Sequence, residues 1–181
     1  MNYESLIFDI DGTLWDSREV VAEGYNIQLE AEGLSHLFVN AETLRPLFGK
    51  VMTEIADILF TSIPEDRRYD LMERCMETEN RHLFTSNRDM SYPNVTETIA
   101  QLSKKHRLFI VSNSQCGYPE VCIDKLGIAP YITGHMCFGD TQGDYEATVE
   151  ARIPFIWCTF GFGTPDDYAA KVDKFEDLLN L

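Results

Sequence analysis

Two aspartates one residue apart follow an apolar stretch near the start of the 181-residue chain, in the sequence LIFDIDGTL of residues 6–14. Carboxylates at the end of a buried strand need compensation, because an unpaired buried charge is costly. A hard cation such as Mg²⁺ is a natural partner for oxygen ligands. Asp9 and Asp11 therefore predict a metal-dependent carboxylate site, and the alternative is a strand-end turn with two solvated aspartates.

The two carboxylates are expected to have different roles. Residues 6–10 are predicted to form a strand buried on both faces, as in parallel sheets, and on a continuing strand Asp9 and Asp11 would point to one face. The carboxylate that faces the metal stays ionised and is a candidate nucleophile. The pKa of the other can be raised, so that it exchanges protons. Gly12 permits the sharp turn that follows.

A second apolar stretch, LFIVSNS at residues 108–114, follows a predicted helix over residues 95–105. This alternation of strand and helix predicts a parallel α/β sheet, which binds ligands beyond the carboxyl ends of its strands. The Ser112 hydroxyl and the adjacent backbone N–H groups suit a phosphate oxygen. The alternative is an ordinary Ser-Asn turn between a strand and a loop.

A third stretch, FGDTQGDY at residues 138–145, places acids after a short apolar run. Asp140 is expected at the tip of a strand. Asp144 follows four residues later, so the two carboxylates can share a face of the first helical turn. The alternative is that the helix dipole simply favours acids at this end of the helix.

Together these stretches resemble the motifs of the haloacid dehalogenase superfamily of aspartate-nucleophile phosphohydrolases. The resemblance implies an α/β fold, with a Rossmann-like parallel sheet core and an inserted α-helical cap. It implies that Mg²⁺ is the cofactor. In the implied roles, Asp9 is the nucleophile and Asp11 the general acid and base. Mg²⁺ is bound by Asp9, the backbone carbonyl of Asp11 and Asp140, and Asp144 supports the metal site. Ser112 and Asn113 bind the phosphate.

The implied reaction is hydrolysis of a small, phosphoglycolate-like phosphate monoester through an aspartyl-phosphate intermediate. An acid at the Asp11 position favours phosphate esters over dehalogenation, which does not need one. A sugar phosphomutase uses the same parts, so this activity stays open.

One element of the family pattern is missing. The superfamily places a lysine between its second and fourth motifs, but no lysine lies between Leu126 and Asp140, and one core strand–helix unit is absent. Lys50, in the predicted cap, is the best candidate for a substitute cation. Loss of one charge donor to the transition state typically costs about 10²–10³ in rate. The alternative function is therefore a domain that binds phosphate or Mg²⁺ with impaired or no turnover.

The deletion leaves the place of the strand before Asp140 open. Beside the first strand, it would let Asp140 meet Asp9. In the missing outer position, it would lie at least two strand spacings, about 10 Å, from the first strand. The core is predicted to comprise residues 1–15 and 93–181, and the helical cap residues 16–92.

The cap prediction rests on apolar residues at helical spacing, which are expected to form its core. Gly49 is either part of a substrate-facing loop or a helix C-cap. The apolar positions include Val20, Val21, Tyr25, Leu29, Ile55, Ile58, Leu59, Leu71, Met72 and Cys75.

Composition narrows the partners. A net charge of −15 disfavours nucleic acid and anionic membranes as partners. The family resemblance implies a small phosphorylated metabolite as the partner. Five cysteines without a CxxC pair indicate reduced thiols, and with no signal-peptide pattern at the N-terminus a cytoplasmic location is expected. The oligomeric state is left open.

Overall fold

The computed structural model describes residues 3–112, 114, 117–135, 149, 155–161 and 164–180. It confirms the predicted α/β class, with parallel strands and surrounding helices. The chain divides into two compact units. The α/β unit comprises residues 1–16, 90–112 and 122–181, and the helical unit comprises residues 17–89 and 113–121.

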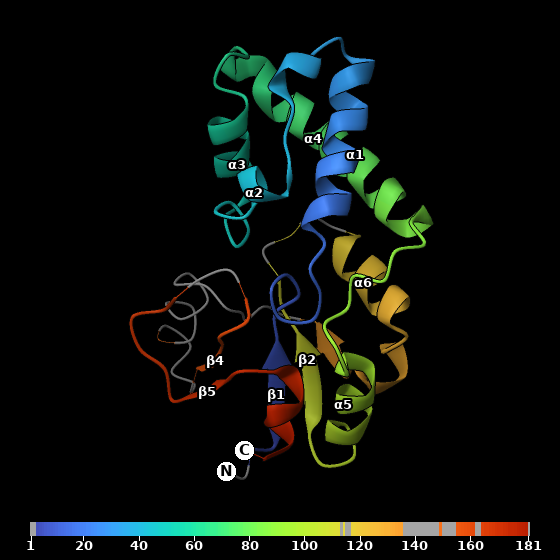
Figure 1. Cartoon of the computed structure of the whole chain (residues 1–181), viewed down its shortest axis with the longest axis vertical. Helices are drawn as coiled ribbons and strands as arrows, with labels where there is room; N and C mark the ends of the chain where they lie inside the picture. Colours follow the sequence, from blue (N-terminus) through green and yellow to red (C-terminus); the bar gives the residue numbers. More distant parts are fainter. Residues whose placement is uncertain are drawn as a thin grey trace. The chain divides into compact units, whose positions relative to one another are not determined.

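A three-stranded parallel sheet lies at the centre of the α/β unit, with the strand order β1-β2-β3 (Figure 1). β1 covers Ser5–Phe8 and β2 covers Arg107–Ile110. The two strands pair in register from Ser5 opposite Arg107 to Phe8 opposite Ile110. Leu108 and Ile110 are fully buried, so β2 is a core strand, as its apolar sequence predicts.

β3, Gly134–His135, pairs with Phe109 and Ile110 of β2. It therefore lies on the side of β2 that faces away from β1. β3 thus lies two strand spacings from β1. The strand predicted immediately before Asp140, for which the sequence left two places open, falls on residues 136–138. Residues 136–140 themselves lie outside the described residues.

The helix predicted over residues 95–105 is present as α5, Val95–Leu102, which precedes β2. α6, Tyr118–Leu126, follows β2. A second, two-stranded parallel sheet pairs β4 with β5. The remaining elements of the α/β unit are β4 Ile156–Cys158, β5 Ala170–Val172, η2 Ala129–Tyr131 and η3 Phe175–Asn180.

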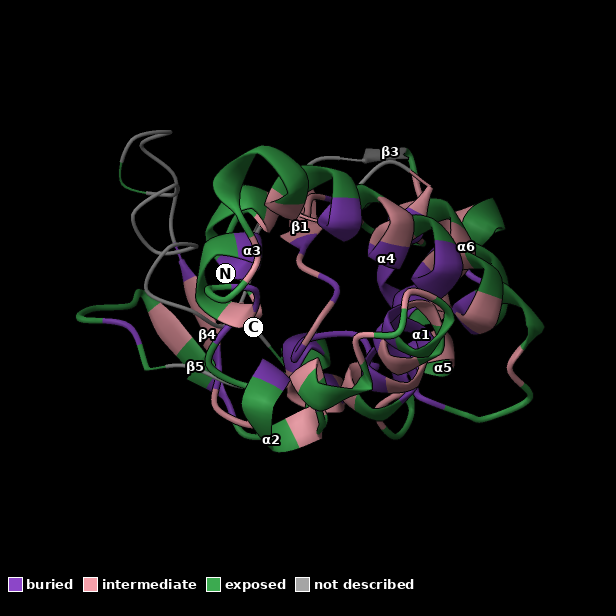
Figure 2. Cartoon of the chain, turned by 90° about the horizontal axis from the view of Figure 1, so that it is seen from above, coloured by how far each residue is buried: buried purple, intermediate pink, exposed green. Residues whose placement is uncertain are grey.

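Two long helices form the centre of the helical unit. α1 and α4 run alongside each other, and Figure 2 shows buried, intermediate and exposed residues alternating around α4. Gly24 permits this approach, because a Cβ at that position would lie 2.7 Å from the Cα of Glu79. The unit contains α1 Arg18–Ala31, η1 Ser35–Leu37, α2 Ala41–Leu44, α3 Met52–Leu59 and α4 Glu65–Thr85.

Most predicted core positions of the helical unit are buried, among them Tyr25, Leu29 and Cys75. Ile58 is an exception, and its assignment to the core was wrong: it is 49% exposed. The buried residues of α3 are Ile55 and Ala56, and Phe60, directly after the helix, is buried as well. These three residues lie on one arc of the helix surface. At 100° per residue, Ile58 falls outside this arc.

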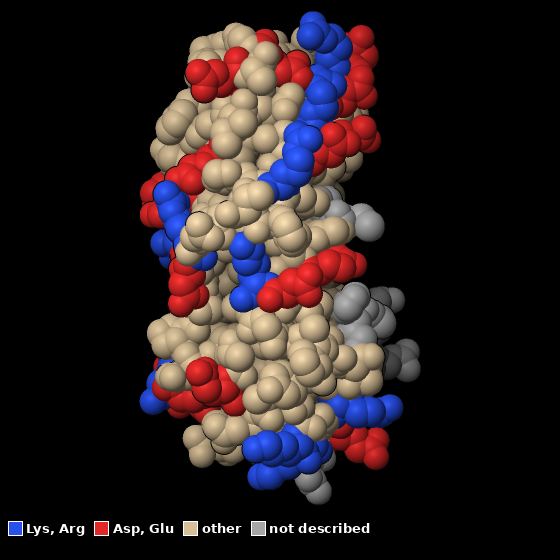
Figure 3. All heavy atoms as spheres, turned by 90° about the vertical axis from the view of Figure 1, so that its right-hand side faces the viewer, with Lys and Arg blue, Asp and Glu red and all other residues tan. Residues whose placement is uncertain are grey.

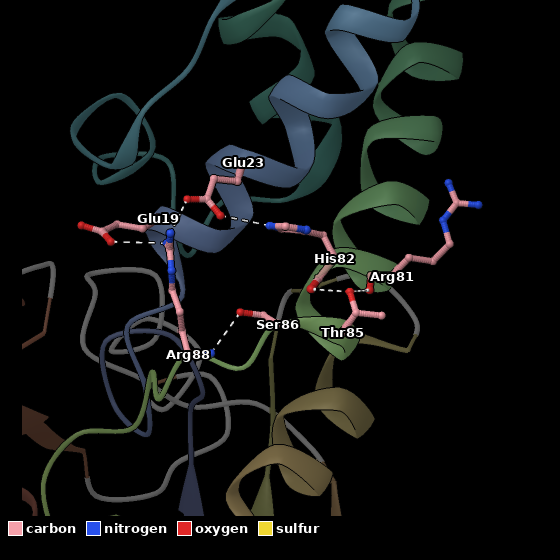
Figure 4. Close-up of polar contacts among 7 residues, drawn as sticks. All are labelled: Glu19, Glu23, Arg81, His82, Thr85, Ser86 and Arg88. Atoms are coloured by element: carbon pink, nitrogen blue, oxygen red, sulfur yellow. Dashed lines mark hydrogen bonds and ion pairs between the residues drawn. The ribbon is translucent and has the colours of Figure 1, made fainter.

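A polar cluster joins both long helices to the segment that follows α4 (Figure 4). Glu23 of α1 contacts His82 of α4 at 3.0 Å and Arg88 at 2.7 Å. Arg88 also lies 3.6 Å from Glu19. The hydrogen bond from His82 and the charge of Arg88 lower the pKa of Glu23. The cluster therefore orders residues 86–88 against α1.

Basic and acidic side chains adjoin one another on the face shown in Figure 3. Arg74 pairs with Glu32 and Arg68 with Asp57 in the same interspersed manner. Within the part of the chain that the structure describes, no helix is both long and apolar enough to cross a membrane.

Candidate active site

The two motif aspartates lie in a tight loop directly after β1. β1 ends at Phe8, because the carbonyl oxygen of Ile10 accepts hydrogen bonds from three backbone N–H groups, those of Thr13, Leu14 and Trp15, at 2.8 to 3.2 Å. Gly12 has a φ of 82°, which glycine adopts without strain. The strand predicted over residues 6–10 is therefore present but ends earlier, at Phe8, and both aspartates follow it. The prediction that it is buried on both faces was wrong, because only Phe8 of β1 is buried.

Ser112 follows the neighbouring strand at the same edge of the sheet. β2 ends at Ile110, and the N–H of Val111 donates to the carbonyl of Phe8 at 2.9 Å. This bond carries the register of β1 and β2 one residue further, so the chains leave the sheet side by side. Asp9 and Ser112 thus occupy the carboxyl ends of adjacent parallel strands, where α/β folds bind ligands.

Cys122, on α6, is a buried thiol that senses the charges of both motif aspartates. Burial raises the pKa of this thiol well above its ordinary value, and the negative charges of Asp11 and Asp9 raise it further. The side chain is fully buried, so it stays a neutral thiol beneath the acids. Sequence reasoning missed Cys122, because it occupies an ordinary apolar position of a predicted helix.

Trp15 makes a direct contact with the second aspartate. Its indole Nε1–H donates to Oδ1 of Asp11 at 3.0 Å. The Trp15 side chain is only 1% exposed. The sequence analysis did not single out this residue. A signal was available, because a buried indole N–H requires an acceptor and carboxylates lie four residues away.

The loop supplies hard oxygen donors that fit Mg²⁺. The Asp9 and Asp11 carboxylates and the loop carbonyls are of the type that Mg²⁺ prefers. The Thr13 hydroxyl is buried and makes no hydrogen bond among the described residues, so the loop has unmet polar capacity. Within the same residues, no group of three or more His, Cys, Asp and Glu side chains forms a complete metal site. A third acid would have to come from elsewhere, and the predicted ligand Asp140 lies outside the described residues.

The other predicted site residues are not all placed. Asn113 and Asp144, like Asp140, lie outside the described residues. Lys50 lies in the helical unit, and its Nζ is 3.8 Å from a carboxylate oxygen of Glu54. Gly49 has a φ of 85°, but α2 ends at Leu44, so Gly49 sits in the following turns rather than at that helix's C-cap.

Two lysines of the α/β unit lie at the wrong edge of the sheet for a role beside Asp9. Lys104 and Lys105 precede β2, whose first residue, Arg107, pairs with Ser5 at the start of β1. Asp9 follows the opposite end of β1. This placement leaves the missing family lysine without a counterpart from this segment.

The sequence matches haloacid dehalogenase-like hydrolases over residues 6–144, which is more than half of the chain. The chain belongs to this family. Membership confirms the resemblance drawn from the motifs and the prediction that the protein is a hydrolase.

Several known proteins are similar to this chain. An uncharacterized protein of Haemophilus influenzae is 26% identical over 145 residues, which span 77% of this chain and 68% of that protein. A solved structure described as a predicted phosphoglycolate phosphatase from Haemophilus somnus has a TM-score of 0.84 at 18% identity, covering 99% of this chain and 98% of that one.

A predicted phosphatase from Clostridium acetobutylicum superposes with a TM-score of 0.78 at 14% identity, and the alignment covers 100% of both chains. Because these identities are low, the two structural comparisons show a shared fold and nothing further.

Proposed function

We propose that the protein is a Mg²⁺-dependent phosphatase that hydrolyses a small, phosphoglycolate-like phosphate monoester through an aspartyl-phosphate intermediate. The observation that carries the proposal is the placement of Asp9 and Asp11 directly after β1, with Ser112 after the adjacent strand β2. The names of two structural neighbours, a predicted phosphoglycolate phosphatase and a predicted phosphatase, support the same substrate class.

In the proposed reaction, a carboxylate oxygen of Asp9 forms a bond to phosphorus as the bond to the ester oxygen breaks. Asp11 gives its proton to the departing oxygen, so the alcohol leaves neutral. Asp11 then takes a proton from the water that attacks the aspartyl-phosphate, which releases inorganic phosphate and restores Asp9. Ser112, with Asn113, holds the phosphoryl oxygens in both steps.

Mg²⁺ would be held by Asp9, the backbone carbonyl of Asp11 and Asp140. When bound, it supplies positive charge that neutralises the phosphoryl oxygens. The oxygen donors of the loop after β1 fit this role, as described above. Asp144 is proposed to support the position of Asp140 as a metal ligand.

Hydrolysis of p-nitrophenyl phosphate in the presence of Mg²⁺ tests the proposal. We expect Asp9→Asn to reduce the rate by at least roughly a thousandfold, because the amide is not a nucleophile. Asp124→Asn, which removes an exposed carboxylate from α6, should retain the wild-type rate and is the matched control. Equal rates for wild type and Asp9→Asn would contradict the proposed enzyme.

A second candidate function is binding of phosphate or Mg²⁺ without efficient turnover. The missing lysine between Leu126 and Asp140 favours it, as does the outer position of β3. In that case, isothermal calorimetry would detect Mg²⁺ binding while p-nitrophenyl phosphate stays intact. A sugar phosphomutase would instead convert one sugar phosphate into its isomer without releasing inorganic phosphate, which phosphate assay and chromatography distinguish.

A further inference from the structure

We propose that Trp15 is a positioning residue for catalysis: it fixes the orientation of the Asp11 carboxylate for proton transfer to the leaving oxygen. This inference rests on the proposed function of Asp11 as general acid. It concerns the direct contact between the two side chains, whose donor is the indole N–H and whose acceptor is Oδ1 of Asp11, at 3.0 Å.

Backbone pairing holds Trp15 rigidly beside the acid. The carbonyl of Trp15 accepts a hydrogen bond from the N–H of Gly12 at 2.9 Å, and Trp15 and Asp11 form a parallel bridge. The distance and orientation of the indole relative to Asp11 are therefore set by the same short loop that carries the carboxylate. Little freedom remains for the ring, since it is almost fully buried.

A second set of backbone contacts clamps Trp15 from the returning segment of the chain. Trp15 forms an antiparallel bridge with Ser91. On either side of this bridge, the N–H of Tyr92 donates to the carbonyl of Leu14 at 3.1 Å and the N–H of Asp16 donates to the carbonyl of Met90 at 2.8 Å. Trp15 thus lies between the acidic loop and residues 90–92, paired with both.

The hydrogen bond from Trp15 occupies one of the two carboxyl oxygens of Asp11, Oδ1. When Oδ1 accepts from the indole, the acidic proton is favoured on Oδ2, which is then the oxygen that delivers it. A general acid is effective only within hydrogen-bond reach and correct alignment of the atom it protonates. Trp15 therefore matters most for esters whose leaving oxygen needs a proton, and least for those that leave readily as anions.

Two esters of similar shape separate these cases. Phenolate is a poorer leaving group than p-nitrophenolate, so phenyl phosphate depends more on the general acid. We expect Trp15→Phe, which retains an aromatic ring and lacks the N–H, to lower kcat for phenyl phosphate roughly tenfold or more. The loss with p-nitrophenyl phosphate should be clearly smaller, and KM for both esters should stay within about twofold.

Trp157→Phe is the matched control, because Trp157 on β4 is the second of the two tryptophans in the chain. It should leave the ratio of the two rates unchanged. If Trp15→Phe fails to fold, Trp15→3-benzothienylalanine preserves the shape of the indole and removes only the N–H. A general packing role would lower the two rates equally in either variant, and that result would overturn the inference.

A spectroscopic readout is independent of turnover. Two tryptophans give two indole N–H cross-peaks in a ¹⁵N–¹H spectrum, which Trp157→Phe assigns. Asp11→Ala should shift the Trp15 cross-peak strongly, since it removes the acceptor, and should leave that of Trp157 in place. An unmoved Trp15 cross-peak would overturn the contact on which the inference rests.

The rates of Asp11→Ala separate the two levels of the proposal. If this variant hydrolyses phenyl phosphate as fast as wild type, or if wild type hydrolyses neither ester, the proposed function fails and the catalytic role of Trp15 fails with it. If Asp11→Ala is inactive while Trp15→Phe keeps the wild-type ratio of rates, the proposed function stands and only the role of Trp15 is overturned.

Discussion

At the scale of single residues, the proposed reaction requires different roles for two carboxylates, those of Asp9 and Asp11. Trp15 donates a hydrogen bond to Asp11, and the sheet register places Asp9 beside the segment that carries Ser112. These unequal surroundings are what different roles for the two acids require. The family lysine has no counterpart between Leu126 and Asp140. The proposed reaction needs a cation in its place, because negative charge accumulates on the phosphoryl group.

Lys50 is the residue through which we expect this cation to be supplied. Its ion pair with Glu54 is long and exposed, so Lys50 can leave it at little cost. Lys50→Ala is expected to lower kcat for p-nitrophenyl phosphate by about 10²–10³. Glu54→Ala removes the partner but keeps the lysine, so it should retain activity. Equal, near-wild-type rates for both variants would assign the missing charge to another group.

At the scale of elements, the sequence predicted the strands and helices that carry the site, because their apolar runs and turns are local signals. The parallel pairing of β1 and β2 and the helix α5 before β2 are confirmed. The end of β1 was not predictable in the same way. It depends on three N–H groups converging on one carbonyl, that of Ile10, and this is a property of the folded loop.

Non-local pairing limited two other predictions. The periodicity that placed Ile58 in a core does not reveal how narrow an arc of α3 is covered. The outer position of β3 depends on hydrogen bonds to β2, which the local sequence does not encode. The contact of Trp15 with Asp11 belongs to the same class, because its geometry comes from bridges to Asp11 and Ser91.

Cys75, a buried thiol of α4, predicts that the protein loses stability in alkaline solution. Burial, with the nearby charges of Glu79 and Glu32, raises the pKa of the Cys75 thiol from 9.0 to about 12. In the unfolded chain this thiol ionises above pH 9.0, whereas in the folded chain it stays protonated until about pH 12. The contribution of this thiol to the free energy of unfolding is therefore fully present below its unfolded pKa. Between the two pKa values it falls by about 1.4 kcal/mol per pH unit.

Urea unfolding at a series of pH values, from neutral pH into the interval between the two pKa values, measures this fall in the free energy of unfolding. We expect Cys75→Ala to remove this contribution to the slope, whatever it costs in packing at neutral pH. Met72→Leu alters a buried residue of the same helix without a titratable group, so it should keep the wild-type slope. The explanation fails if the alkaline slopes of wild type and Cys75→Ala coincide.

At the scale of the whole molecule, the chain carries 30 acidic and 15 basic residues, with a net charge of −15. A field of this sign opposes the approach of a phosphate ester, so the site must be neutralised locally before an anion binds. Asp9 and Asp11 add to the acidity at the point where the ester would bind. A cation held by these acids would remove both obstacles at once.

Mg²⁺ is accordingly expected to stabilise the folded protein whether or not turnover is efficient. At tenfold excess over its dissociation constant, a ligand specific for the folded state contributes about 1.4 kcal/mol. For a chain of this size, that corresponds to roughly 3–5 °C in Tm, which differential scanning fluorimetry resolves.

NaCl at equal ionic strength is the necessary comparison, because any salt screens repulsion in so acidic a protein. Asp9→Asn also relieves repulsion between the two carboxylates, so its Tm without metal is not informative, and the quantity to compare is the shift caused by Mg²⁺. That shift should shrink to the NaCl value in Asp9→Asn and persist in Asp124→Asn. A Mg²⁺ shift equal in wild type and Asp9→Asn would locate cation binding away from the loop after β1. Persistence of the shift in a protein without phosphatase activity would favour the binding function over the enzyme.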